Sequence, residues 1–188
     1  HDVDGLVELM GGRDAFIGKL DSLFTADSKL EGESTSVDIS GLIGQYAHGN
    51  EPSHHIAHLY NYVGQPWRTQ EIVDEVLHTL YFNIPDGLSG NEDCGQMSAW
   101  YILNAMGFYQ VCPGKPVYSI GRPLFNEATV HLKDGKSFKV IAHNNSRDNK
   151  YVRSIVLNGN KLETPFFTHQ DIVDGGTLEL TMGSEPLK

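Results

Sequence analysis

The pattern of apolar residues changes once along this chain, near Cys112-Pro113-Gly114. Before that point apolar residues recur at helical spacing, and after it they occur in short runs separated by turn residues. Helices followed by hairpins predict an α+β fold, in which helices and an antiparallel sheet occupy different parts of the chain. We therefore expect a helical region over residues 1–111 and an antiparallel β region over residues 112–188.

Four helices are expected in the first region. The clearest stripe lies between Asp14 and Phe24, where apolar residues fall on one helical face. Pro52 fits the first turn of a second helix, and Thr69 could cap a third. The expected helices span residues 14–24, 52–63, 66–81 and 93–108. The short connections between the later helices favour antiparallel neighbours.

Two hairpin signals mark the second region. Short turns that contain Gly and Asn between alternating runs are typical of β-hairpins. The predicted strand pairs are 128–132 with 137–142, around Asp134-Gly135, and 151–157 with 161–164, around Asn158-Gly159. A last strand is expected over residues 177–182, after a helical turn over residues 168–173.

Charge and cysteine content limit the classes of partner and compartment. The 188 residues carry 24 acidic and 14 basic side chains, a net charge of −10, which argues against nucleic acid and anionic membranes as partners. No apolar run approaches the roughly 20 residues of a membrane span. Cys94 and Cys112 favour two free thiols, with a disulfide left open. The chain begins at His1 without a signal-peptide pattern, which suggests a processed chain or a fragment.

A dense histidine cluster lies between His48 and His58. His54 and His58 are four residues apart and would share a helical face, as zinc ligands do. The alternative, which we favour, is that these histidines bridge helices through hydrogen bonds. Glu51 with Asn50 suits a hard cation such as calcium, which takes oxygen ligands from carboxylates and from backbone or Asn carbonyls, although Asn-Glu before Pro also fits an ordinary helix start.

A second polar cluster, Gly90 to Gln96, precedes the expected fourth helix. At that place Glu92 and Asp93 would interact favourably with the helix dipole and would stabilise the helix by about 0.3–1 kcal/mol. A carboxylate in this place could also act as a general base towards water. On the residues alone the helix-dipole interpretation is favoured. Cys94 is a weak candidate for a nucleophile, because no partner histidine can be assigned from the sequence.

Two long strings in these clusters resemble signature blocks of glycoside hydrolase family 92. They are Tyr46-Ala47-His48-Gly49-Asn50-Glu51-Pro52-Ser53-His54-His55 and Gly90-Asn91-Glu92-Asp93-Cys94-Gly95-Gln96-Met97-Ser98-Ala99-Trp100-Tyr101. The segments 1–6 and 121–125 are also similar to that family, which comprises bacterial calcium-dependent exo-acting α-mannosidases. The resemblance implies that this chain is the C-terminal portion of such an enzyme. Its helices would be the last ones of a catalytic (α/α)6 barrel, followed by an antiparallel β-sheet element.

The resemblance also implies roles for individual residues. Asp93 matches the catalytic base of an inverting hydrolysis, whereas Asn91 holds an aspartate in some members. Glu51 and Asn50 match calcium ligands, Asn50 through its backbone carbonyl, and the calcium would bind hydroxyls of the mannose. Glu92 and His48 are expected to bind substrate. The catalytic acid would be a glutamate upstream of His1, so the missing N-terminal part of the enzyme is the expected partner and the isolated chain is expected to be inactive.

The expected substrate is terminal α-linked mannose on glycans, and the family implies a periplasmic or secreted protein. The linkage stays open, with α-1,2 the commonest expectation. The loop from Ser28 to Asp38, including Glu31 and Glu33, corresponds to a region that shapes the leaving-group subsite. An alternative is a carbohydrate-binding or structural fragment without activity. Four aromatic side chains of the β region could then stack on sugars, although packing in the core is favoured: Tyr118, Phe125, Phe166 and Phe167.

Overall fold

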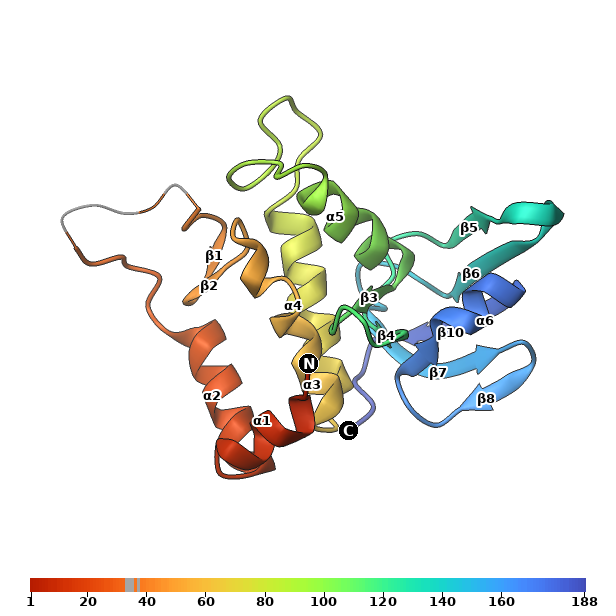
Figure 1. The fold of residues 1–188 in the computed structure, drawn as a ribbon, viewed down its shortest axis with the longest axis horizontal. Helices are drawn as coiled ribbons and strands as arrows, with labels where there is room; N and C mark the ends of the chain where they lie inside the picture. Colours follow the sequence, from red (N-terminus) through yellow and green to blue (C-terminus); the bar gives the residue numbers. More distant parts are fainter. Residues whose placement is uncertain (33–35, 37) are drawn as a thin grey trace.

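Helices and sheets occupy different parts of the molecule. The computed structural model describes residues 1–32, 36 and 38–188. Figure 1 shows helices α1–α4 gathered on one side, the strands β5–β10 on the other, and α5 between them. The mixed helix-and-sheet fold predicted from the sequence is confirmed.

The helical part contains most of the expected helices. Its elements are α1 (Val3–Leu9), α2 (Arg13–Thr25), η1 (Glu51–Ser53), η2 (Ile56–His58), α3 (Leu59–Tyr62), α4 (Pro66–Thr79) and α5 (Gln96–Met106), together with the short strands β1 (Leu42–Ile43) and β2 (Tyr46–Ala47). The apolar stripes predicted α2 and α4, whereas α1, β1 and β2 were not expected. The predicted cap at Thr69 is wrong, because Pro66 begins α4 and Thr69 lies buried inside it.

The single helix expected over residues 52–63 is broken into η1, η2 and α3. The break has a physical cause in the hydrogen bonds of His54. Its carbonyl oxygen accepts a bond of 2.9 Å from the indole Nε1 of Trp100. A carbonyl used in this way is drawn out of the regular i to i+4 ladder, so the backbone winds through short 3-10 turns.

The fourth helix begins three residues later than predicted. Asp93, Cys94 and Gly95 all have positive φ angles, 54°, 56° and 98°, so they cannot belong to a right-handed helix. The helix ends before Gly107, whose φ of 104° lies in the left-handed region where glycine is favoured. The helix thus ends two residues before the predicted end at Phe108, and residues 108–110 form a strand.

The β part consists of two sheets. A three-stranded sheet has the order β3-β4-β9, and a five-stranded sheet has the order β5-β6-β10-β7-β8. The strands are β3 (Phe108–Gln110), β4 (Val117–Ile120), β5 (Glu127–His131), β6 (Ser137–His143), β7 (Tyr151–Leu157), β8 (Asn160–Leu162), β9 (Phe166–Thr168) and β10 (Gly176–Gly183). The 3-10 turn η3 (Lys133–Gly135) joins β5 to β6, and α6 (His169–Asp174) precedes β10. Both hairpins, the helical turn and the last strand are thus confirmed.

The larger sheet is antiparallel at every pairing except one. β10 runs antiparallel to β7 and parallel to β6. The expectation of a wholly antiparallel sheet is corrected here. A parallel pair needs a long crossover connection. The chain between β6 and β10 is long enough, since it forms β7, β8, β9 and α6 before it returns to the middle of the sheet.

Each of the two parts has its own hydrophobic core, and Leu103 of α5 packs against both cores. Polar side chains of α4 join the parts as well. The Gln70 side chain accepts a bond of 3.1 Å from the backbone nitrogen of Val152, and Asp74 pairs with Arg122 at 2.9 Å. Among the described residues, no helix has the length and apolar character that crossing a membrane requires.

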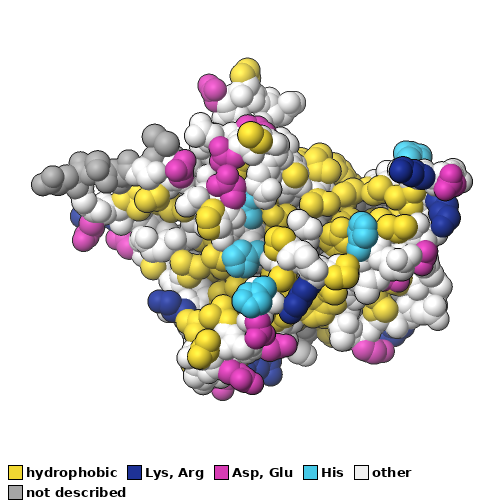
Figure 2. Space-filling view, in the orientation of Figure 1, with side chains coloured by type: hydrophobic (Ala, Val, Ile, Leu, Met, Phe, Trp, Pro, Cys, Tyr) yellow, Lys and Arg dark blue, Asp and Glu magenta, His cyan; other side chains and the backbone are white. Residues whose placement is uncertain are grey.

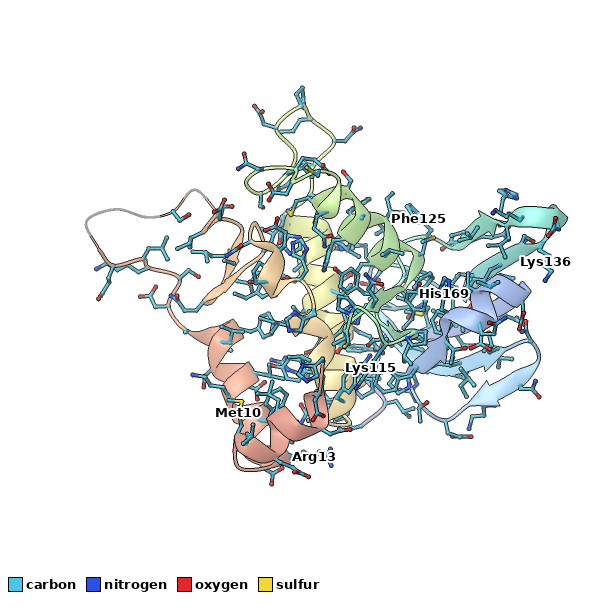
Figure 3. All side chains as sticks on the ribbon, viewed as in Figure 1. Met10, Arg13, Lys115, Phe125, Lys136 and His169 are labelled. Atoms are coloured by element: carbon cyan, nitrogen blue, oxygen red, sulfur yellow. The ribbon has the colours of Figure 1, made fainter. Side chains whose placement is uncertain are left out.

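The aromatic residues considered for sugar stacking pack mainly inside the β part. Phe167 is 3% exposed and lies in the second core. Tyr118 stacks on Phe167, and Phe166 contacts Tyr62 of α3. Phe125 is more exposed and lies where the chain enters β5 (Figure 3). The arrangement supports packing more than a sugar-binding platform.

Candidate active site

Three loops meet next to the N-terminus of α5. The backbone nitrogens of His48 and Gly49 donate to the carbonyl oxygens of Gly41 and Ser40, each at 3.1 Å. A Cβ atom on Gly49 would overlap the Ser40 hydroxyl, and one on Gly90 would lie 2.9 Å from it. This close approach of the three loops brings their acidic side chains together. In the space-filling view acidic side chains gather in this region, with histidines below them (Figure 2).

Asp93 lies in a left-handed turn that aims its side chain at the neighbouring loop. Its carboxyl group faces that of Glu51, and Asp38 and Glu92 are also near. Partial burial raises the pKa of Asp93, and repulsion from Glu51 and then from Asp38 and Glu92 raises it further. Positive φ angles in a non-glycine residue cost free energy and cluster at functional sites. The turn and the neighbouring carboxyl of Glu51 together make Asp93 a candidate for a reacting group.

The Glu92 carboxylate differs from that of Asp93 in its partners, which are backbone N–H groups. Its carboxylate accepts hydrogen bonds from the backbone nitrogens of Gly95 and Ser98, the latter at 3.1 Å. These bonds with Ser98, and then the bond with Gly95, lower the pKa of Glu92. Glu92 thus satisfies free N–H groups at the start of α5, which is the helix-stabilising interpretation of this cluster. Its predicted contact with substrate stays a prediction.

His48 lies beneath the site and is fully buried. Its Nδ1 lies 2.8 Å from the Tyr46 hydroxyl and its Nε2 lies 2.7 Å from the Tyr81 hydroxyl. Burial, with a smaller contribution from His54, lowers the pKa of His48 to about 3, so the ring is neutral. Both nitrogens have protein partners, so the geometry gives no support to the prediction that His48 binds substrate.

The two histidines considered as zinc ligands each use both ring nitrogens in hydrogen bonds to protein groups. His54 contacts the His48 carbonyl oxygen at 2.9 Å and the Gln96 amide at 3.0 Å. His58 contacts Ser119 at 3.1 Å and Asn104 at 2.8 Å. Burial lowers the pKa of both histidines. In the part of the chain that the structure describes, no three His, Cys, Asp or Glu side chains converge as metal ligands, so the bridging interpretation is favoured.

Glu51 and Asn50 suit a hard cation better than a transition metal. The Asn50 carbonyl oxygen accepts one bond, of 3.0 Å, from Ser53, which leaves it a second lone pair. The facing carboxyls of Glu51 and Asp93 repel one another, and a divalent cation at Glu51 would relieve that repulsion. Calcium binds six to eight oxygens, many from water or carbonyl groups. These two residues therefore fit as part of a calcium site and leave its other ligands to be supplied elsewhere.

Three contributors to the site were not found from the sequence. Asp38 is the last residue of the Ser28–Asp38 loop and lies near Asp93. In the sequence, only its acidic charge at the end of a polar loop could have indicated a role in the site. Tyr81 and Gln96 support the site from α4's C-terminal end and from α5. Of the loop residues that the sequence suggested, Glu31 is exposed and Glu33 lies outside the described residues.

A separate cavity of about 410 Å³ lies between the segment that follows α4 and helix α5. It is lined by Tyr81, Phe82, Asn83, Gly87, Leu88, Ser98, Tyr101 and Ile102. Neither Asp93 nor Glu51 lines it, so the carboxylate pair lies outside this cavity.

Known proteins resemble this chain over nearly its whole length. The model of the glycosyl hydrolase family 92 catalytic domain matches residues 1–184. A family 92 α-mannosidase from Bacteroides thetaiotaomicron, solved with mannoimidazole, has a TM-score of 0.88 and 43% identity over 94% of this chain and 23% of its own. An inverting family 92 mannosidase from the same bacterium has a TM-score of 0.84 and 44% identity over 99% of this chain and 26% of its own.

A curated relative comes from the fungus Arthroderma benhamiae. It is described as an uncharacterized secreted glycosidase and is 31% identical over 188 residues, which is 98% of this chain and 22% of the relative. This chain therefore spans only 22% to 26% of the length of these three relatives. Relatives occur outside the bacteria that the resemblance in the sequence implied.

Proposed function

Because this chain belongs to glycoside hydrolase family 92, we propose that it supplies the general base and part of a calcium site to an inverting α-mannosidase. The observation that carries the proposal is the Asp93 turn, which holds a carboxylate of raised pKa against Glu51 in front of α5. A general base works best when its pKa approaches the working pH. Partial burial is the largest cause of the raised pKa of Asp93, and it does not depend on the charge of Glu51, which bound calcium would offset.

The proposed reaction is the hydrolysis of a terminal α-linked mannose. Asp93 takes a proton from water while the water oxygen attacks the anomeric carbon, and the bond to the leaving-group oxygen breaks as an acid protonates that oxygen. Inverting glycosidases hold their two carboxyl groups about 6.5–9.5 Å apart, which leaves room for the water. The acid implied by the family resemblance is a glutamate outside this chain, so the N-terminal part of the enzyme is the proposed partner.

Glu51 and the carbonyl oxygen of Asn50 would hold calcium in this proposal. Bound calcium would supply positive charge that orients mannose hydroxyls and favours the distorted ring. Glu51 would then bind the cation through its carboxylate, and the bound charge would offset the repulsion between Glu51 and Asp93.

Mannose-containing glycans, such as N-glycans, are the substrate class that we propose. The mannoimidazole complex of a relative supports a mannose-like ring in the site. A secreted or periplasmic location is supported by the description of the fungal relative as secreted. Glycans occur mainly outside the cytoplasm, which is consistent with a secreted or periplasmic location.

Asp93→Asn tests the proposal, in a protein of the relatives' length that carries this chain. The change keeps the shape of the side chain and removes the proton acceptor. We expect kcat on an aryl α-mannoside to fall about 10²- to 10⁴-fold, with little change in the affinity for a ground-state ligand. The matched control is Asp86→Asn, which removes an exposed carboxylate from the preceding loop and should leave kcat unchanged. Normal turnover of Asp93→Asn would assign the base to another residue.

A further inference from the structure

Two turns that carry the site carboxylates share one backbone hydrogen-bond pattern, although the Asp93 turn is left-handed and the Glu51 turn is a right-handed 3-10 turn. In the first, the backbone nitrogen of His54 donates to the carbonyl oxygen of Glu51 at 3.0 Å. In the second, the backbone nitrogen of Gln96 donates to the carbonyl oxygen of Asp93 at 3.2 Å. Each carboxylate therefore opens a turn whose fourth residue is fixed to it through the backbone. The two fourth residues, His54 and Gln96, then contact one another.

The side chains of His54 and Gln96 are joined by a hydrogen bond of 3.0 Å. Donor and acceptor roles follow from their partners. The His48 carbonyl oxygen can only accept, so the Nε2 of His54 donates to it at 2.9 Å. The Gln96 nitrogen can only donate, so the Nδ1 of His54 accepts. His54 is thereby a neutral ring with its hydrogen on Nε2, and any other state would break one of the bonds.

Gln96 uses both of its amide hydrogens in this arrangement. The second one is donated to the hydroxyl of Tyr109, at 3.1 Å, and Tyr109 is buried on β3. Trp100, one turn further along α5, donates its indole hydrogen to the carbonyl oxygen of His54. Helix α5 thus holds His54 at both its ring and its backbone. The connection is buried, since His54 is 2% and Trp100 0% exposed.

We propose that His54 and Gln96 are positioning residues, which hold the Glu51 turn and the Asp93 turn at a fixed separation. The inference rests on the proposed function, because its consequence is the placement of the base against the sugar. His54 and Gln96 act through the backbone of their turns, and neither is assigned a contact with the reacting atoms. Groups that orient a reacting side chain typically change activity about 10- to 100-fold when they are lost.

The first test reads the state of His54 in the unaltered 188-residue chain. Long-range ¹⁵N–¹H correlation spectra distinguish the two neutral forms of a histidine ring. We expect His54 to carry its hydrogen on Nε2, and Gln96→Met to shift the His54 Nδ1 resonance while that of His55 stays in place. His55 is the natural internal reference, since it neighbours His54 and makes none of these bonds. A hydrogen on Nδ1 of His54 would overturn the proposal, whatever the stability of the variant.

The second test measures kinetics in a protein of the relatives' length that carries this chain. Gln96→Met keeps the length of the side chain and removes both hydrogen bonds. We expect kcat to fall about 10- to 100-fold while KM changes less than about threefold, since the base acts only in the transition state. Gln110→Met, the same change at an exposed position of β3, is the matched control and should behave as the parent.

Asp93→Asn measured beside these variants separates the two proposals. If Asp93→Asn loses turnover and Gln96→Met keeps it within about twofold, the positioning role is wrong and the proposed function stands. If Asp93→Asn keeps turnover, the proposed function itself fails. A loss in both variants, with normal melting of Gln96→Met, supports the positioning role.

Discussion

Neighbouring carboxylates in the turn before α5 have pKa values shifted in opposite directions. Glu92 accepts backbone hydrogen bonds, which favour its charged form, so its pKa is lowered. Asp93 faces Glu51 and loses water, so its pKa is raised. One turn of backbone thus produces a helix-stabilising anion and a proton acceptor side by side. The opposite shifts of the two pKa values depend on the φ angles of this turn, which the sequence does not reveal.

Glu92→Gln should reduce the acid sensitivity of the chain. A carboxylate whose pKa is lower in the folded state stabilises the fold above its unfolded pKa of about 4.5, and this contribution is lost as the pH falls through the folded pKa. We expect the melting temperature of the parent to exceed that of the variant at pH 7, and the difference to shrink below pH 4.5. Glu31→Gln, at an exposed loop position, is the control and should show no such difference. A difference independent of pH would contradict the assignment.

Glu51→Gln tests the cation. The change removes a charged ligand and also the repulsion on Asp93, and it keeps the size of the side chain. In a protein of the relatives' length that carries this chain, we expect the calcium concentration needed for half-maximal binding, measured by calorimetry, to rise about 10-fold or more. Glu31→Gln again gives the comparison for a surface charge. Unchanged calcium affinity would remove Glu51 from the ligands.

At the scale of elements, the left-handed turn Asp93-Cys94-Gly95 makes a prediction about stability. A Cβ at Gly95 meets no atom within 4 Å, so Gly95→Ala changes only the backbone preference. We expect a loss of about 1–2 kcal/mol in the free energy of unfolding. Cys94→Gly, at an exposed neighbour with a φ of 56°, should cause no loss, because glycine adopts that angle freely. Urea unfolding of both variants measures these changes in the free energy of unfolding. Equal losses in the two variants would show that the left-handed conformation of the turn is not their cause.

The elements that the sequence predicted well are those formed by local patterns. The stripe of α2 and the two hairpin turns depend on residues within a few positions, so their existence was expected correctly. The break at His54 depends on Trp100, which is 46 residues away, and no local pattern reports such a partner. The candidate site shows the same division. Glu51 and Asp93 were found as motifs, whereas Asp38 and the role of Gln96 emerge only when the loops meet.

At the scale of the whole molecule, the ion pair of Asp74 and Arg122 connects the helical and β parts. Arg122 is 2% exposed, and its Nε lies 2.9 Å from the carboxylate of Asp74 on α4. Removal from water lowers the pKa of Arg122, and the nearness of Asp74 opposes that effect. The pair belongs to a small charged cluster, because the Asp74 carboxylate also lies 3.2 Å from His78 and 3.8 Å from Arg147. Loss of Asp74 would leave the buried Arg122 without this acidic partner, which is the costlier change.

Arg122→Met should destabilise the chain by about 1.5–3 kcal/mol, because Asp74 loses the nearest of its basic neighbours and keeps His78 and Arg147. The double variant Arg122→Met with Asp74→Leu should lose less than Arg122→Met alone. The matched comparison is Lys161→Met, which breaks the exposed pair with Glu163 and should cost no more than about 1 kcal/mol. Chemical denaturation of the parent, Arg122→Met, Asp74→Leu and the double variant gives the coupling energy of the pair. Additive losses would show that the two side chains do not act as a pair.

The central place of β10 in the larger sheet has a consequence for how the protein is made. β10 is the last strand along the chain, yet it lies between β6 and β7 and carries the buried Leu178, Leu180 and Met182. During synthesis β6 and β7 leave the ribosome first and have no partner between them, so their inner edges stay open. The β part can close only when residues 176–183 emerge. A chain truncated before Gly176 would leave strand edges unpaired and apolar side chains exposed. Such a product would be prone to aggregate and would be bound by chaperones or degraded by proteases.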